Sequence, residues 1–176
     1  MLQLFIFYLF NIMVYLDINK SNYKNNGKDL VKDLDRFLGV KDNKVFILIF
    51  MEGCGPCNAT RPEWKKIEHA LKNKYGKNEN IVIADVDQEL LKEIKYLTTQ
   101  PKGFPTIRYI SNKGKTSEDY EDCPDVKEKD RKIDSFIKWI DSKMSKQKGG
   151  KRRTKNRKIT RSIKRKTRKN KTQKRK

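Results

Sequence analysis

The sequence is poor in the residues that build metal centres and disulfide scaffolds. Its 176 residues include three cysteines and one histidine. Three cysteines are too few for a network of stabilising disulfides, and a structural zinc site needs four ligands, usually in two close pairs. Only Cys54 and Cys57 are closely spaced, whereas Cys123 and His69 stand alone. The sequence therefore implies neither a metal site nor an organic cofactor.

No apolar run is long enough to span a membrane. Residues 4–10 are apolar and the run resumes after Asn11, but it ends at Asp17, whereas a spanning helix needs about 20 residues. A signal peptide would carry basic residues before the apolar stretch and small residues after it, and both are missing. Three interpretations stay open: a membrane or signal segment through residues 4–10, an apolar extension over 1–12, or a start assigned too early, with Met13 as the true first residue.

The C-terminal segment 146–176, called the tail below, has no acidic residue. It holds 18 of the 43 lysines and arginines, which leaves 25 basic and 22 acidic residues in 1–145. The net charge of +21 therefore belongs almost entirely to the tail. Its only sizeable apolar residues are Ile159 and Ile163, so the tail cannot form a core of its own and we expect it to be disordered.

A polycationic tail of this kind suits several roles. Sequence-independent binding to nucleic acid or another polyanion is the leading one, because many cations release many counterions. A nuclear-import signal, attraction to an anionic membrane and simple solubilisation are the alternatives. The tail lacks aromatic residues, which argues against stacking on single-stranded bases. The predicted polyanion contacts are Lys151, Arg152, Arg153, Arg157, Lys158, Arg165, Lys166 and Arg168.

The apolar pattern predicts an α/β domain over residues 13–145. We expect strands in 13–18, 44–50, 80–87, 105–110 and 116–120. The segment 44–50 is a continuous apolar run, as in a strand buried on both faces, and 80–87 is expected to be a second buried strand. Helices are expected in 30–38, from the cysteine pair to about Tyr75, in 88–97 and in 133–144. Pro62 should bend the second of these. The order predicts a mixed sheet that is parallel first and closed by an antiparallel hairpin with its turn at 111–115.

The pair in Cys54-Gly55-Pro56-Cys57 stands where a buried strand gives way to a helix. There the first cysteine meets the helix N-terminus, whose free N–H groups and dipole favour a thiolate. The second cysteine lies one turn later on the same face, within bonding reach of the first. A permanent structural bridge across so small a loop would add little stability. A reactive dithiol that exchanges disulfides is therefore the favoured interpretation.

The chain resembles the thioredoxin family, including the catalytic domains of protein disulfide isomerases. The resemblance rests on CGPC at a strand end, Pro62 five residues later and the GFPT motif at 103–106, and it covers residues 13–144. It implies a thioredoxin fold in which Cys54 is the nucleophile, Cys57 the resolving thiol and Pro105 a cis-proline facing both sulfurs. Protein disulfides or dithiols would be the substrates of a monomeric enzyme, bound with the help of Gly55, Pro56, Phe104 and Thr106.

Two features depart from the family's pattern. Gly53 stands where a tryptophan usually precedes the first cysteine, which should widen the approach to Cys54. Leu48 stands where the family buries an acid that helps the second cysteine lose its proton, and our alignment places Ile83 at the position of the acid's lysine partner. Replacing a whole buried ion pair is often tolerated in folding. Without the acid, however, Cys57 should stay protonated to higher pH, so that activity rises with pH.

We interpret the third cysteine, the histidine and the two tryptophans as structural residues. Cys123 lies in an acidic connection and is predicted to be an inert surface thiol, with an auxiliary redox role as the alternative. We expect His69 to face solvent, and Trp64 and Trp139 to pack in the core or at its boundary.

The function predicted from the sequence is thiol–disulfide exchange with protein substrates. The alternative is a nucleic-acid-associated or virion structural protein with a vestigial domain, because the basic Gly-Gly-Lys tail resembles those of proteins from large DNA viruses. A cytoplasmic, nuclear or virion location is favoured over the secretory pathway or a membrane anchor.

Overall fold

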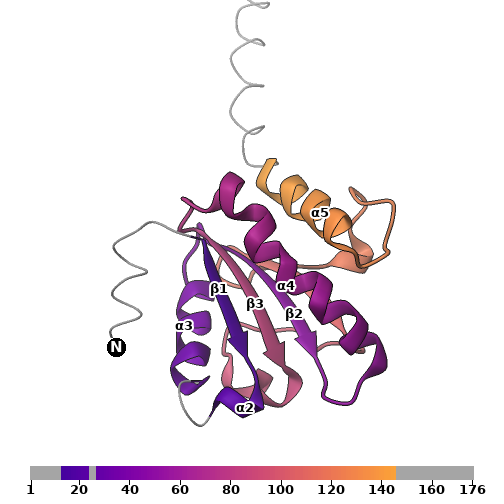
Figure 1. Cartoon of the computed structure of the whole chain (residues 1–176). Coiled ribbons are helices and arrows are strands. Elements are labelled where there is room, and N and C mark those ends of the chain that lie inside the picture. The colour runs from indigo at the N-terminus through magenta and orange to yellow at the C-terminus, as the bar shows by residue number, and fades with distance from the viewer. Residues whose placement is uncertain (1–12, 24–26, 146–176) are drawn as a thin grey trace, which may run out of the picture. The chain divides into compact units, whose positions relative to one another are not determined.

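A mixed sheet of five strands forms the centre of the computed structural model, which describes residues 13–23 and 27–145 (Figure 1). The strands are β1 (Val14–Ile18), β2 (Lys44–Phe50), β3 (Ile81–Asp87), β4 (Thr106–Ser111) and β5 (Thr116–Asp119). They lie in the order β1-β3-β2-β4-β5. Both β1 and β2 run parallel to β3, whereas β4 is antiparallel to β2 and to β5. The predicted parallel core with an antiparallel hairpin is confirmed.

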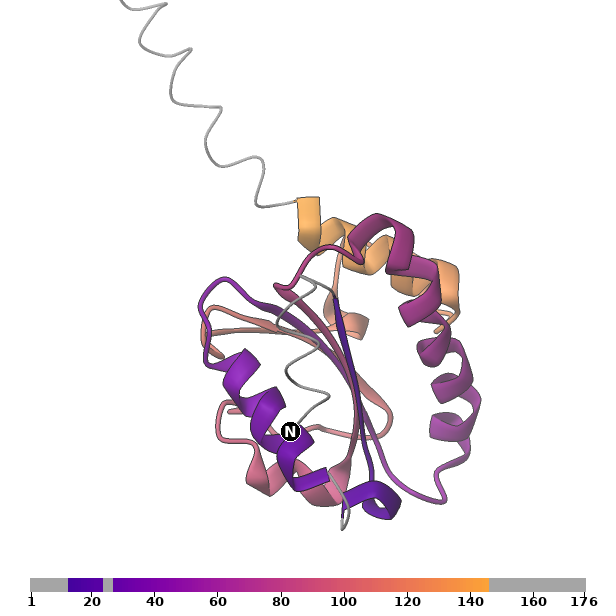
Figure 2. The same cartoon turned by 60° about the vertical axis from the view of Figure 1, so that its left-hand side comes forward.

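Helices cover both faces of the sheet. The long ones are α3 (Lys28–Leu38), α4 (Gly55–Tyr75) and α5 (Ile133–Ser145), and the short ones are α2 (Lys20–Asn22) and the 3₁₀ turns η2 (Gln88–Glu93) and η3 (Tyr120–Asp122). Figure 2 shows α3 and η2 on one face of the sheet and α4 with α5 on the other. Residues up to Ile140 form one unit; a second begins at Asp141, and its described part, 141–145, completes α5.

The side chains of the central strands form an apolar layer on each face of the sheet. Alternate residues of β2, such as Ile47, pack with the buried residues of α3 and η2. The intervening residues face α4 and α5: the ring of Phe46 lies 5.3 Å from that of Trp139, and Trp64 packs edge-on against Phe136 at the same distance. Both tryptophans are fully buried, which confirms their predicted place in the core. A strand sandwiched in this way must be apolar on both sides, which explains its unbroken apolar sequence.

The helix predicted over residues 88–97 is wrong in type and length. The 3₁₀ turn η2 ends at Glu93, and Ile94 is extended, with φ −97° and ψ 102°. The backbone N–H of Tyr96 donates to the Asp35 carboxylate of α3 at 3.1 Å, so a tertiary contact replaces a helical hydrogen bond. The apolar residues of this segment are buried all the same. Their spacing therefore predicted burial correctly and the backbone conformation incorrectly.

Cys123 is not the surface thiol that its acidic surroundings predict. Only 2% of its surface is exposed, and its sulfur lies 3.7 Å from an Asp125 carboxylate oxygen. The segment is anchored by Tyr120 and Val126, which are both buried. These two apolar side chains turn inward and carry Cys123 with them, whereas most of the polar residues around them remain exposed or half-exposed.

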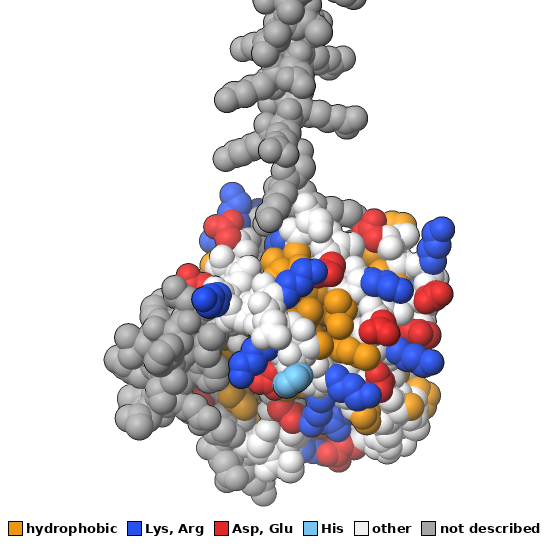
Figure 3. Space-filling model, turned by 45° about the horizontal axis from the view of Figure 1, so that its top comes forward, with side chains coloured by type: hydrophobic (Ala, Val, Ile, Leu, Met, Phe, Trp, Pro, Cys, Tyr) orange, Lys and Arg blue, Asp and Glu red, His pale blue; other side chains and the backbone are white. Residues whose placement is uncertain are grey.

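The surface of the described domain carries both charge signs. In Figure 3, lysine and arginine side chains alternate with aspartate and glutamate around an apolar area, and the single histidine, His69, is exposed as predicted. No helix within residues 13–23 and 27–145 is long and apolar enough to cross a membrane. The predictions for residues 1–12 and for the tail lie outside the described residues.

Candidate active site: the dithiol and the proline loop

The loop from β2 to α4 delivers the first cysteine to a helix N-terminus. Gly53 has a φ of +74°, in the left-handed region that glycine adopts without strain. A Cβ at Gly53 would meet no described atom within 4 Å. The position where the family usually carries a tryptophan is therefore open. Cys54 then acts as the N-cap of α4, with φ −79° and ψ 113°.

Cys54 and Cys57 form a disulfide, with their Cα atoms 5.2 Å apart. The backbone N–H of Cys57 donates to the sulfur of Cys54 at 3.2 Å. Cys54 keeps 8% of its surface exposed, whereas Cys57 is fully buried. Of the two residues, therefore, only Cys54 has surface that another molecule can contact.

The GFPT segment lies against the dithiol, although fifty residues separate Cys54 from Phe104 in the chain. The sulfur of Cys54 lies 3.8 Å from the carbonyl oxygen of Phe104. The Phe104–Pro105 peptide bond is cis, and Pro105 is buried. Thr106 opens β4, and its hydroxyl donates to the Gly103 carbonyl at 2.7 Å. The structure thus brings the two sequence motifs into one surface, with Gly55 and Pro56 exposed beside them.

A buried carboxylate that the sequence did not lead us to expect lies on β3, in the layer between the sheet and α4. In the register of β2 and β3, Leu48 pairs with Asp85, while Ile83 pairs with Phe46. The residue beside Leu48 is therefore Asp85 and not Ile83. Asp85 has no exposed surface, and its Oδ2 accepts a hydrogen bond from Arg61 Nε of α4 at 3.1 Å. Asp85 of β3 is thus a buried acid whose cation comes from α4.

Burial and charge act in opposite directions on this carboxylate. Burial raises the pKa of Asp85 to about 6, and Arg61 limits the rise. The pKa of the Tyr15 hydroxyl is also raised, first by burial and then by the charge of Asp85. Sequence reasoning missed both members of the ion pair. The available signals were an aspartate inside the apolar run of β3 and an arginine four residues after Cys57.

Comparison with known proteins agrees with this geometry. Residues 27–139 match the family model described as Thioredoxin. The chain belongs to the thioredoxin family. This family member is 30% identical over 117 residues to protein disulfide-isomerase 1 of Dictyostelium discoideum, a match that covers 63% of this chain and 28% of that protein.

A second relative of this thioredoxin-family chain is protein disulfide isomerase-like 2-1 of Oryza sativa subsp. japonica, 30% identical over 101 residues, with coverage of 56% and 24%. The chain thus spans about a quarter of the length of these two relatives. Among solved structures, the zinc-bound form of human ERp44 has a TM-score of 0.52 at 15% identity, covering 74% of this chain and 31% of that one. This likeness shows the fold alone.

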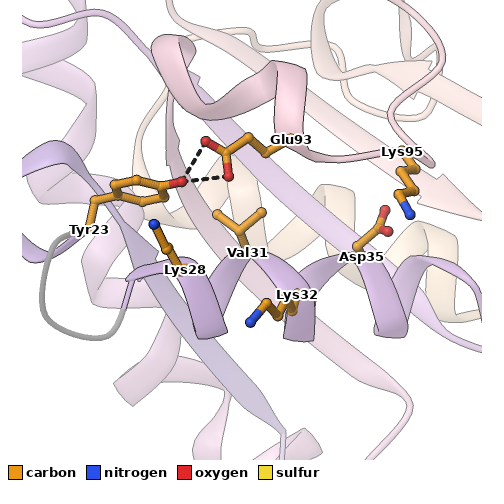
Figure 4. A pocket seen from close by; sticks show the side chains of 7 residues that line it. All are labelled: Tyr23, Lys28, Val31, Lys32, Asp35, Glu93 and Lys95. Atoms are coloured by element: carbon orange, nitrogen blue, oxygen red, sulfur yellow. Dashed lines mark hydrogen bonds between the residues drawn. The ribbon is translucent and has the colours of Figure 1, made fainter.

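The thioredoxin-family domain also has a hollow that the dithiol does not reach. It measures about 390 Å³ and lies between α3 and the segment around η2 (Figure 4). Its lining is mixed in charge, and the Tyr23 hydroxyl within it donates to the Glu93 carboxylate at 2.5 Å. Neither cysteine and no residue of the GFPT segment lines it. No group of three or more potential metal ligands occurs among the described residues.

Proposed function

We propose that this chain is a thiol–disulfide oxidoreductase that acts on protein disulfides or dithiols. The proposal is carried by one observation: the disulfide between Cys54 and Cys57 caps α4, and its outer sulfur lies beside the cis Phe104–Pro105 bond. A bridge that only stabilised the fold would gain little from closing a loop this small. At a helix N-terminus, by contrast, a reduced Cys54 is favoured as a thiolate.

The exposures of the two cysteines support the roles that we propose for them. In the reducing direction, the Cys54 thiolate attacks one sulfur of a substrate disulfide, forms a mixed disulfide and releases the other substrate sulfur as a thiolate. Cys57 then loses its proton and attacks the Cys54 sulfur, which releases the second substrate thiolate and closes the Cys54–Cys57 disulfide. Two electrons pass to the substrate, and a thiol reductant must reduce the pair again. Oxidation of a substrate dithiol follows the same steps in reverse.

The surroundings of the outer sulfur favour a protein as the substrate. A Cβ at Gly53, Gly55 or Gly103 would meet no described atom within 4 Å, so the rim offers little obstruction to a large partner. Phe104, Pro105 and Thr106 lead into β4, and their backbone can pair with an extended substrate segment as a further strand would. Pro105 is thus the residue that faces the substrate.

A trapping experiment tests the proposal. Full-length Cys57→Ser, reduced and then mixed with oxidised insulin, should accumulate a covalent adduct through Cys54 that dithiothreitol releases, because no second thiol completes the exchange. Cys54→Ser should form no adduct, and Cys123→Ser should behave like the parent chain. If Cys57→Ser formed no adduct, or Cys54→Ser formed as much, the dithiol would be vestigial and the proposal would fail.

We also propose that the tail binds nucleic acid or another polyanion independently of sequence. The supporting observation is its 18 basic residues without a single acid, against a body with a net charge of only +3. Each phosphate neutralised releases counterions, which makes such binding strong at low salt and weak at high salt. The tail would then hold the oxidoreductase domain close to a polyanionic surface.

A further inference from the structure

The stretch of chain that leads into the cis Phe104–Pro105 bond receives little support from its own backbone. Residues 98–104, called the approach segment below, belong to no helix or strand. Within the described chain they make no backbone-to-backbone hydrogen bond, and Pro101 has no N–H to donate. The conformation of the approach segment must therefore be held largely by side chains.

Three side chains contact the backbone carbonyls of the approach segment. The Thr106 hydroxyl donates to the Gly103 carbonyl at 2.7 Å, a contact across only three residues. The sulfur of Cys54 lies 3.8 Å from the next carbonyl oxygen along, but this sulfur changes its partner during disulfide exchange. The third side chain is Arg108 of β4, whose Nη1 donates to the carbonyl of Thr99. Of the three contacts, this one involves a charged donor and no reacting atom.

Arg108 is itself fixed to the sheet by a second set of hydrogen bonds. It stands opposite Asp119 in the register of β4 and β5. Its Nη2 donates to Oδ2 of Asp119 at 3.1 Å, and its Nε donates to the other carboxylate oxygen. Only 2% of the Arg108 surface is exposed. One planar guanidinium therefore joins the edge strand β5 to the approach segment, and a lysine ammonium does not present donors in this fork geometry.

Folding stability is a weak explanation for this buried ion pair. Apolar residues of similar volume can often replace such a pair without loss of stability, and the neighbour of Arg108 on β2 is the apolar Ile47. An apolar residue would not, however, supply a charged donor to the Thr99 carbonyl. The contribution specific to Arg108 is therefore the placement of the approach segment.

We propose that Arg108 is a positioning residue for the substrate-binding backbone around Pro105. The inference rests on the proposed disulfide exchange, in which an extended protein segment pairs with this backbone. By holding the Thr99 carbonyl, Arg108 keeps the approach segment ordered before a substrate arrives, so that binding does not have to order it. A small disulfide that needs only the sulfur of Cys54 gains nothing from this order. Arg108 therefore favours protein disulfides over small ones.

Two disulfides of different size test this with the full-length chain. The reduced protein is mixed with insulin or with dithionitrobenzoate, a small aromatic disulfide that yields two thionitrobenzoate ions as the Cys54–Cys57 disulfide closes. Arg108→Met combined with Asp119→Leu removes the whole ion pair, so the fold should persist while the Thr99 carbonyl loses its donor. The rate constant with insulin should fall roughly tenfold, the factor for ordering about one further backbone residue. The rate constant with dithionitrobenzoate should stay at the parent value.

Two further variants separate the anchor from general effects of charge. Arg108→Lys keeps a cation beside Asp119 but not the fork of donors, so it should lose part of the rate with insulin and none of the rate with dithionitrobenzoate. The matched control is Arg36→Gln, which removes an arginine paired with Asp33 at 3.1 Å within α3. Both of its rates should equal those of the parent. Thermal unfolding shows whether each variant folds, and Arg108→Lys decides the question if the double variant does not.

Nuclear relaxation provides a readout that needs no substrate. The ¹⁵N order parameters of the Gly103 and Phe104 amides should fall in the double variant and stay unchanged in Arg36→Gln. Unchanged order parameters, equal losses of rate with both disulfides, or an insulin rate equal to the parent's would each overturn the inference. If the parent itself reacted with neither disulfide, the proposed exchange would fail instead, so the two failures are distinguishable.

Discussion

At the scale of single residues, Asp85 is the side chain whose ionisation should have the clearest effect on the free energy of unfolding. Its pKa in the folded protein is raised to about 6, from an ordinary value of 3.8. Between these two values the folded state holds a proton that the unfolded chain has already released. Stability therefore falls as pH rises from about 4 to about 6 and then levels off, with a total loss of about 3 kcal/mol from this one group.

Comparison with Asp85→Asn isolates this contribution. Denaturant unfolding at pH 4, 5, 6 and 7 should show the parent losing about 2 kcal/mol relative to Asp85→Asn across that range, because the amide has no proton to lose. Glu79→Gln changes an exposed carboxylate. The difference between its free energy of unfolding and that of the parent should depend far less on pH. Parallel pH profiles for the parent and Asp85→Asn would contradict the raised pKa.

The sequence was enough to predict the site residues that belong to short motifs. It was not enough for a residue whose neighbours depend on how two strands are aligned. Cys54, Cys57 and Pro105 belong to patterns that are legible in the chain, and the structure brings them together. Asp85 could not be placed beside Leu48 without the register of β2 and β3. Most positions of both parallel strands are apolar, so the sequence alone did not fix their register and did not distinguish Asp85 from Ile83 as the neighbour of Leu48.

At the scale of elements, the end of α4 and the start of β1 depend on one glycine. Gly76 caps α4 through its N–H to the Lys72 carbonyl, and its own carbonyl accepts the N–H of Met13 at 3.0 Å. A Cβ at Gly76 would overlap the Lys72 carbonyl oxygen, which is backbone and cannot rotate away. Gly76→Ala must therefore displace the cap and, with it, the hydrogen bond to Met13.

The expected cost of Gly76→Ala is about 1–3 kcal/mol in the free energy of unfolding. Gly39→Ala is a matched control, since Gly39 caps α3 with the same helical backbone conformation. Its Cβ would lie 3.1 Å from a ring carbon of Tyr96, a side chain that can move, so its cost should be smaller. Denaturant melts of both variants measure the difference, and equal costs would show that the overlap at Gly76 is relieved without consequence.

Helices and strands with a long apolar pattern could be predicted from the sequence. Segments whose backbone conformation depends on tertiary contacts could not. The unbroken apolar run of β2, the largely apolar segment of β3 and the periodic residues of α3 and α5 predicted the correct elements. The segment after β3 has four apolar residues at helical spacing, yet only η2 forms, because the Tyr96 N–H is taken by Asp35. Burial of Cys123 likewise depends on Tyr120 and Val126, whose inward turn no local pattern reveals.

At the scale of the whole molecule, the excess positive charge and the reactive cysteine pair lie in different parts of the chain. The body has 25 basic and 22 acidic residues, and both signs are mixed over the face shown in Figure 3. The tail has 18 basic residues and no acid. A long-range attraction to polyanions should therefore come from the tail, and disulfide exchange from the domain. The two activities should be separable by changing charges alone.

Neutralising part of the tail tests this separation in the full-length chain. Binding to a duplex DNA fragment should weaken by roughly 10⁴-fold between 50 and 200 mM salt if each of the eight predicted contacts neutralises one phosphate. A variant with glutamine at all eight predicted contacts should bind more weakly and lose about 0.9 from the logarithmic salt slope for each contact removed. Those positions are Lys151, Arg152, Arg153, Arg157, Lys158, Arg165, Lys166 and Arg168.

A chain with a scrambled tail of unchanged composition is the matched control. It should bind as tightly as the parent with the same salt slope, because the attraction depends on charge and not on order. Insulin reduction by the parent, the neutralised variant and the scrambled variant should proceed at one rate, since Cys54, Cys57 and Pro105 are untouched. If the neutralised variant kept the parent's affinity and slope, the eight positions would not be polyanion contacts, and the proposed binding through them would be wrong.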